Sequence, residues 1–195
     1  MRTRDENKEQ AIREKALEMI VKEGFEGLSM QKLAQEANVS PATIYLYFKN
    51  KEDMLNQLYM SIEQIFSDEI LTDFNSEMSL EEGMWIQWKN RFAYSMKYPY
   101  NFTFMEQFRS SPLINHKDLK ESPFKDAMTK FYMNALGRNE MKKFPVEIFW
   151  SIGYGPLYSL IRFHRAEKSL MNDKFVFDEK KMRIAFDLVM KALKN

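Results

Sequence analysis

The chain has 195 residues, of which 45% are hydrophobic and 29% charged, and its formal net charge is +1. A chain of this length and composition can bury a core, and it is unlike a disordered protein. The absence of cysteine excludes a disulfide framework, a thiol nucleophile and a thiolate metal site, and no apolar run reaches the ~20 residues that span a bilayer. Because the start, MRTRDENKEQ, lacks the apolar segment of a secretion signal, we expect a cytoplasmic protein without a membrane partner.

Three short helices are predicted at the beginning of the chain. The apolar residues of the first recur at helical spacing up to Gly24, which is placed to end that helix. Ser29 would cap the second helix, and Ser40 followed by Pro41 would start the third. Asn50 would then cap a longer fourth helix.

Longer helices are predicted in the remainder of the chain. Ser79 and Glu82 form a capping box, Ser122 followed by Pro123 repeats the serine-proline start, and Asp178 would cap the last helix. The expected helices cover residues 79–97, 99–109, 123–137, 145–167 and 178–193. We therefore expect an all-α protein with about nine helices.

A longer motif runs through the three short helices. The segment GFEGLSMQKLAQEANVSPATIYLYFKNKEDML, residues 24–55, resembles the DNA-binding head of the TetR (tetracycline repressor) family of bacterial transcriptional regulators. Gly24 ends the first helix of that head, Val39 and Ser40 form the turn, and IYLYFKNKEDML closes the unit. The turn position that usually holds glycine is Asn38, a residue that also tolerates left-handed geometry.

The resemblance implies two domains. Residues 1–50 would form a three-helix helix-turn-helix DNA-binding domain, and residues 51–195 a larger helical domain for effector binding and dimerisation. The implied function is that of a sequence-specific transcriptional regulator, a repressor that a lipophilic or aromatic small molecule releases from a palindromic operator. The alternative is a DNA-binding protein that senses no ligand and acts as an architectural or partner-controlled factor.

The predicted third helix carries the expected DNA contacts. No acidic residue occurs from Ala37 to Lys51, so this helix could approach phosphates without charge repulsion. By resemblance, its N-terminal residues and Gln31 lie nearest the bases, and we expect Gln31 and Thr43 to read the sequence. Later residues would hold the backbone, although packing against the first helix is an alternative for Tyr45. The expected DNA-binding residues are Gln31, Ser40, Pro41, Ala42, Thr43, Tyr45, Tyr47 and Lys51.

The larger helical part is rich in aromatic residues and methionine. Such residues line adaptable apolar ligand sites, and the resembled family places an effector pocket in this part of the chain. At helical spacing, however, any single aromatic residue is more often part of a core. The expected ligand-binding residues are Trp85, Trp88, Phe92, Phe104, Met105, Phe108, Phe131, Trp150 and Tyr154.

The last two long helices are expected to form a homodimer. Each has a wide apolar stripe, which fits a four-helix interface with a partner chain, as in the resembled family; the alternative is that both are ordinary core helices. The stripes are Phe149, Trp150, Gly153, Leu157, Leu160 and Ile161 in the first and Met182, Ala185, Phe186, Val189 and Leu193 in the second.

Catalysis is not expected. The chain has two histidines, neither of them at Glu-x-x-His spacing, and it lacks HExxH, a Gly-Lys phosphate loop and a nucleophile elbow. The GYGP segment at 153–156 has neither the lysine nor the preceding strand of a phosphate loop, so we interpret it as a helix kink or a close packing contact. We expect no catalytic residue, no metal site and no cofactor.

Overall fold

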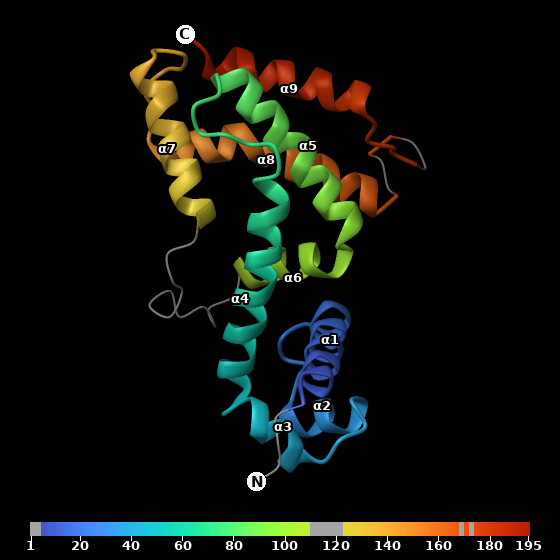
Figure 1. The fold of residues 1–195 in the computed structure, drawn as a ribbon. Coiled ribbons are helices and arrows are strands. Elements are labelled where there is room, and N and C mark those ends of the chain that lie inside the picture. Colours follow the sequence, from blue (N-terminus) through green and yellow to red (C-terminus); the bar gives the residue numbers. More distant parts are fainter. Residues whose placement is uncertain (1–4, 110–122, 168–169, 172–173) are drawn as a thin grey trace. The chain divides into compact units, whose positions relative to one another are not determined.

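The computed structural model describes residues 5–109, 123–167, 170–171 and 174–195, and within these ranges the chain forms helices and no strand (Figure 1). In chain order the helices are α1 (Glu6–Glu23), α2 (Met30–Glu36), α3 (Pro41–Tyr47), α4 (Lys51–Ile70), α5 (Leu80–Lys97), α6 (Pro99–Arg109), α7 (Pro123–Gly137), α8 (Val146–Arg165) and α9 (Glu179–Leu193). The all-α prediction is confirmed, although Ser122, the predicted cap of α7, lies outside the described residues. Among the helices described, none is both long and apolar enough to cross a membrane.

Local hydrogen bonds end and begin the helices where the sequence predicts. The hydroxyl of Ser40 accepts from the backbone N–H of Thr43 at 3.2 Å and so caps α3. Ser79 and Glu82 form the predicted capping box before α5, because each side chain accepts from the other residue's backbone N–H. Between α2 and α3, Asn38 has a φ of 52°, the left-handed geometry that the turn requires.

The GYGP segment lies inside α8 and makes a close packing contact, one of the two interpretations of its sequence. A Cβ at Gly153 would lie 3.1 Å from Cε of Met84, and the Gly153 carbonyl accepts a hydrogen bond from the indole N–H of Trp88 at 2.8 Å. Residues before proline disfavour the helical region because their Cβ clashes with the proline ring. Gly155 has no Cβ and avoids this clash before Pro156, which lies inside α8.

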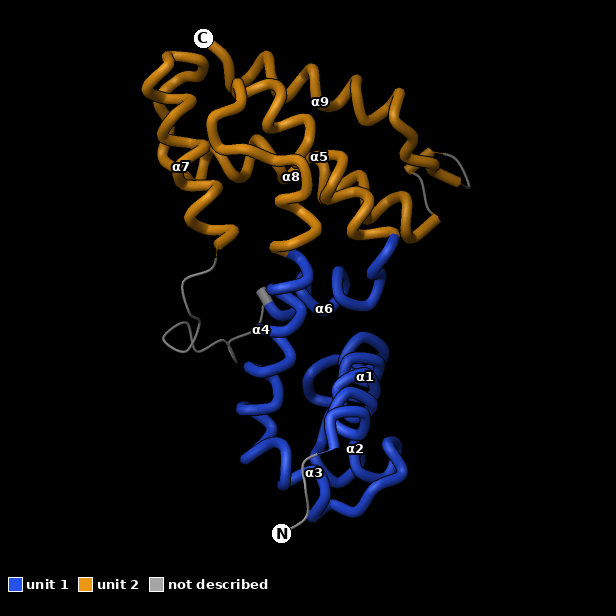
Figure 2. Tube along the Cα trace, in the orientation of Figure 1, with its two compact units in different colours: residues 1–66, 97–120 blue, residues 67–96, 121–195 orange. Residues whose placement is uncertain are grey.

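The chain divides into two compact units (Figure 2). The N-terminal unit consists of residues 1–66 and 97–120, and the C-terminal unit of residues 67–96 and 121–195. Compactness therefore groups α6 and most of α4 with α1, α2 and α3. The predicted boundary at residue 50 separates a DNA-binding domain from an effector-binding and dimerisation domain. This division by function stays a prediction.

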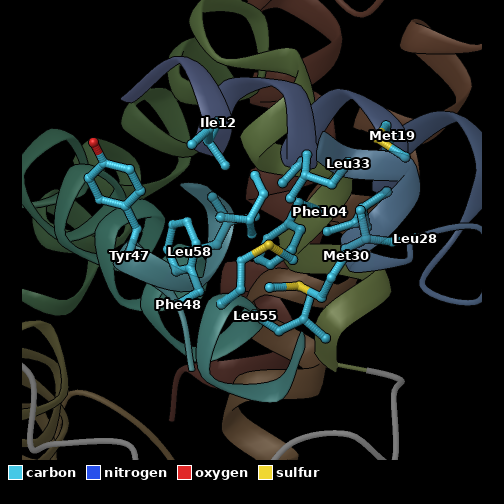
Figure 3. Close-up of a cluster of buried hydrophobic side chains, with 14 of the residues drawn as sticks. Ile12, Met19, Leu28, Met30, Leu33, Tyr47, Phe48, Leu55, Leu58 and Phe104 are labelled. Atoms are coloured by element: carbon cyan, nitrogen blue, oxygen red, sulfur yellow. The ribbon is translucent and has the colours of Figure 1, made fainter. Parts of the chain in front are cut away.

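One core holds the N-terminal unit together (Figure 3). Ile12 of α1, Leu33 of α2 and Phe48 after α3 are fully buried in it. Helix α6 packs against α1 and adds Phe104 and Phe108, whose stacked ring centroids are 5.3 Å apart. The three short helices thus depend on α4 and α6 for much of their buried apolar surface.

The apolar stripes of α8 and α9 serve the core of their own chain. The two helices pack against each other within the C-terminal unit. The buried stripe residues are Phe149, Gly153, Leu157, Ile161, Met182, Phe186, Val189 and Leu193. The assignment of these residues to a dimer interface was therefore wrong, because an interface residue must be exposed in the single chain. Other residues on the same helices are exposed and apolar, among them Ile184 and Leu188 of α9.

Candidate nucleic-acid interface and effector site

The turn between α2 and α3 sets which residues of the head face solvent. After α2 ends, the backbone N–H of Val39 donates to the carbonyl of Ala34 at 2.9 Å, and the left-handed Asn38 reverses the chain. Ser40 and Pro41 then start α3 directly. With Ile44 and Phe48 directed into the core, the opposite face of α3 is left exposed.

Most of the predicted DNA-binding residues are exposed. These are Gln31, Ser40, Pro41, Ala42 and Tyr45, the last with 55% of its surface accessible. Leu46 is exposed to a similar extent, at 58%, and was not named from the sequence. Its signal was available, because it is an apolar residue on the face of α3 opposite the buried Ile44 and Phe48.

Two predicted contacts instead support the head. The side chain of Thr43 is largely buried, and its hydroxyl lies 2.9 Å from the hydroxyl of Ser40. The ammonium of Lys51, at the start of α4, donates to the carbonyl of Phe25 at 2.7 Å. Of the two residues expected to read bases, Gln31 is therefore the one that is exposed.

Tyr47, another predicted contact, braces α1. It is 8% exposed, and its hydroxyl donates to the carbonyl of Asp5 and accepts from the N–H of the same residue, both at 3.2 Å. Asp5 is the N-cap of α1, so these bonds tie the end of α3 to the start of α1. Figure 3 shows the Tyr47 ring at the edge of the core cluster with its hydroxyl pointing outward. The bracing tyrosine is thus Tyr47, whereas Tyr45 is exposed.

Removing the Tyr47 hydroxyl should destabilise the head without changing DNA affinity. We expect Tyr47→Phe to lower the free energy of unfolding by about 1 kcal/mol, because two hydrogen bonds to Asp5 are lost. Urea unfolding followed by circular dichroism measures this. Tyr45→Phe is the matched control and should leave stability unchanged while weakening DNA binding. If Tyr47→Phe weakened DNA binding at unchanged stability, its hydroxyl would be a phosphate contact.

The charges of the head also favour DNA contact through α3. On α1, Glu18 lies 2.8 Å from the ammonium of Lys15 and 2.6 Å from that of Lys22. The hydrogen bond from Lys15, followed by that from Lys22, lowers the pKa of Glu18 to about 2. Glu18 is therefore paired with lysines of α1 itself, while α3 carries no acid that would repel phosphates.

The residues predicted to bind ligand fall into separate clusters. Phe104, Met105 and Phe108 belong to the core of the N-terminal unit. In the C-terminal unit, the rings of Trp85 and Trp88 both contact Phe186, with centroids 5.0 and 5.4 Å away. The other pairs are Phe92 with Phe177, Phe131 with Phe74, and Trp150 with Tyr154. Their role in ligand binding stays a prediction.

Comparison with known proteins identifies the head. Residues 12–58 match the family model described as bacterial regulatory proteins, tetR family. A Haemophilus influenzae protein named as an uncharacterized HTH-type transcriptional regulator is 37% identical over 101 residues, 52% of this chain and 53% of that protein. A fatty acid metabolism regulator protein of Bacillus subtilis is 35% identical over 69 residues, 35% of this chain and 36% of that protein.

The head of this chain, residues 12–58, belongs to the TetR family. The matches cover about half or less of the length of these relatives. A crystal structure of a TetR family transcription regulator from Marinobacter aquaeolei shares the fold over 100% of both chains, with a TM-score of 0.76 and 22% identity. These relatives are regulators by name, in agreement with the prediction that the chain is not an enzyme.

A buried arginine in the C-terminal unit was not predicted from the sequence. Arg91 of α5 is 1% exposed, and its guanidinium donates to the hydroxyl of Tyr158 and to the side-chain oxygen of Gln87. A signal for it was available, because Arg91 lies one helical turn from Gln87 and Trp88 on the stripe that α5 buries. An arginine at helical spacing is ordinarily read as part of a solvated face.

Aromatic rings surround the Arg91 guanidinium. Its central carbon lies 4.3 Å from the ring centroid of Tyr154, 5.1 Å from that of Trp150 and 5.3 Å from that of Phe124. Burial raises the pKa of the Tyr154 hydroxyl above its ordinary value, against the opposing effect of Arg91. Tyr154 therefore stays protonated and can donate a hydrogen bond.

Proposed function

We propose that this protein is a sequence-specific DNA-binding transcriptional regulator that represses transcription from a palindromic operator. The observation that carries the proposal is the exposed, acid-free face of α3, with Ala42 and Tyr45 on it and Gln31 exposed on the preceding helix. Gln31 would read a base, since its amide can bind adenine through two hydrogen bonds. Ala42 would contact a thymine methyl, and Tyr45 would contact the phosphate backbone.

The proposal includes a homodimer formed through the last two helices. A palindromic operator requires a two-fold protein whose recognition helices are about 34–36 Å apart or a multiple of this spacing. Exposed apolar side chains on both helices support this arrangement: Val146 and Ile148 on α8, and Ile184 and Leu188 on α9. Burying them against a second copy would remove apolar surface from water.

The proposed signal is a lipophilic or aromatic small molecule. Helix α4 is one continuous helix that belongs to the N-terminal unit up to Phe66 and to the C-terminal unit from Ser67. A ligand that binds one conformation of the C-terminal unit more tightly than another would favour the position of α4 in that conformation. The change in this equilibrium cannot exceed the difference between the ligand's affinities for the two conformations. The name of the Bacillus subtilis relative, a fatty acid metabolism regulator, fits a lipophilic effector.

A regulator that senses no ligand is the second candidate. It is favoured by the tight packing of the predicted pocket residues, since Trp88, Phe131 and Tyr154 are fully buried against other rings. The two candidates differ in one testable respect. An effector changes the DNA affinity of a sensor and leaves that of an architectural protein unchanged.

Selection from a library of random palindromes tests the DNA-binding proposal. We expect the purified protein to retain one palindrome at both of two salt concentrations. Gln31→Ala should weaken binding of that palindrome about tenfold and relax the preference at one base pair of each half-site. Gln64→Ala is the matched control, because Gln64 is an exposed glutamine on α4 and should not contact DNA.

The outcomes of this selection separate two kinds of binding. Loss of affinity for one sequence on Gln31→Ala, but not on Gln64→Ala, supports base reading by Gln31. Retention of DNA without sequence preference, with a steep dependence on salt, would contradict sequence-specific regulation, because contacts to phosphates alone behave in this way.

A further inference from the structure

A fully buried guanidinium such as that of Arg91 is rare in proteins. Burying a charge costs free energy even when it is paired, and a methionine or leucine of similar size would fill the same space without that cost. Arg91 is among the largest fully buried side chains of the described residues. A function other than packing therefore accounts better for an arginine here.

The groups around Arg91 match the chemistry of an organic acid. A guanidinium binds a carboxylate through two parallel N–H···O bonds, and the rings of Trp150, Tyr154 and Phe124 offer apolar surface beside it. The Tyr154 hydroxyl is buried and makes no hydrogen bond of normal geometry within the residues that the structure describes. It is thus a second group that can donate to a carboxylate oxygen.

Two of the rings around Arg91 reach the surface of the protein. Arg91 and Tyr154 are fully buried, but Trp150 and Phe124 are only half-buried. Trp150 also lines a surface hollow of about 410 Å³ together with Val146, Glu147 and Ser151, of which Val146 belongs to the proposed dimer interface. The aromatic rings therefore extend from the buried cation toward solvent.

We propose that the effector is a small organic acid whose carboxylate binds Arg91 and Tyr154 and whose apolar body lies against Trp150 and Phe124. The regulatory effect of the acid rests on the proposed function, whereas binding of the acid to Arg91 does not, since binding itself requires no DNA. The expected lipophilic or aromatic compound is thereby narrowed to one that carries a negative charge.

Arg91 is also connected to the end of α4 by two hydrogen bonds. Its guanidinium donates to Oε1 of Gln87 at 3.2 Å, and the amide of Gln87 donates to the carbonyl of Ile70 at 2.8 Å. Ile70 is the last residue of α4, the helix that begins at Lys51 in the N-terminal unit. A carboxylate that attracts the guanidinium would weaken the hydrogen bond between Arg91 and Gln87. The hydrogen bond from Gln87 to Ile70, at the end of α4, would then change as well. Gln87 is in this sense a positioning residue.

Paired acids and alcohols test the binding step. The probes are dodecanoate, phenylacetate and naphthoate, each compared with its alcohol (dodecanol, phenethyl alcohol and naphthylmethanol) by titration calorimetry with the full-length protein. We expect at least one acid to bind about tenfold or more tightly than its alcohol, because charged hydrogen bonds are the stronger ones. Arg91→Met should remove this difference and leave the affinity for the alcohol unchanged.

Controls separate binding from folding. Arg91→Met fills the same space with an apolar side chain, so the variant should fold, and Arg91→Lys, which keeps the charge, should retain part of the preference. Arg183→Gln is the matched control, because Arg183 also lies over two rings, Trp85 and Phe186, but is exposed. It should bind acids as the wild type does.

Three results would overturn the proposal: no acid binds, acids and alcohols bind equally, or the preference for acids survives in Arg91→Met.

The step to α4 is tested with Gln87→Met, which should still bind the acid but no longer be released by it from the selected palindrome. Release of Gln87→Met by the acid would contradict the role of Gln87. If wild-type protein retained no palindrome, the regulatory function would fail, while calorimetry would still decide whether Arg91 binds acids.

Discussion

Leu188→Glu should convert the proposed dimer into monomers and weaken binding to the selected palindrome by about a hundredfold or more. Leu188 is 62% exposed on α9, so a glutamate there costs the single chain little stability. In a dimer formed through α8 and α9, the same glutamate would place a charge in an apolar interface. Each half-site would then be bound by a separate head, without the gain from linked binding. Analytical ultracentrifugation and operator titration measure the two effects.

Met133→Glu on α7 is the matched control for this experiment. Met133 is exposed to a similar extent, at 58%, and lies outside α8 and α9. It should leave both the dimer and the DNA affinity unchanged. If Leu188→Glu remained dimeric with full operator affinity, the interface would lie elsewhere, and a monomer produced by Met133→Glu would point to α7.

The second large effect is expected in the core of the C-terminal unit. Gly83 of α5 faces the ring of Phe131, and a Cβ at this position would lie 2.6 Å from Cζ of that ring. The ring cannot give way easily, because it is fully buried and packs edge-on against Phe74 with centroids 5.2 Å apart. Gly83→Val should therefore lower the free energy of unfolding by about 3 kcal/mol or more, measured by chemical denaturation.

Gly137→Ala provides the comparison for Gly83→Val. Gly137 is the last residue of α7, and a Cβ built there would meet no atom within 4 Å. Since alanine has a higher helix propensity than glycine, this variant should be neutral or slightly more stable. Equal stability of Gly83→Val and the wild type would show that α5 and α7 do not pack as closely as described.

Ligand binding and dimer formation are proposed to use different helices of the C-terminal unit. Arg91 lies on the buried stripe of α5, and Leu188 lies on the exposed side of α9. Substitutions at one should therefore not mimic substitutions at the other. Arg91→Met is expected to alter ligand preference in an intact dimer, and Leu188→Glu to separate the subunits while ligand preference persists.

Local signals determined the helix ends. The Ser40 cap, the capping box of Ser79 and Glu82 and the left-handed Asn38 all occur as the sequence predicted. The partners in these motifs are at most three residues apart, so the interaction is formed by the chain segment itself. The head motif was recognisable for the same reason, because its caps, turn and core positions lie within one short segment.

Contacts between distant residues decided what the side chains do. The choice of Tyr47 rather than Tyr45 as the brace depends on Asp5, which is 42 residues away. The apolar stripes of α8 and α9 could equally have faced a partner chain, until their packing against each other placed them in the core. In the same way, Arg91 is buried because α8 brings Tyr154 and Tyr158 over it.

The sequence by itself thus determined the nine helices that the described residues form, the helix-turn-helix head and the exposed face of α3, since periodicity, caps and turns act over a few residues. Only the tertiary structure decided that Thr43 and Tyr47 support the head, that Leu188 is exposed, and that an arginine lies among aromatic rings in α5. Burial depends on which distant helices cover a residue, and a helical pattern specifies the face but not the element that will pack against it.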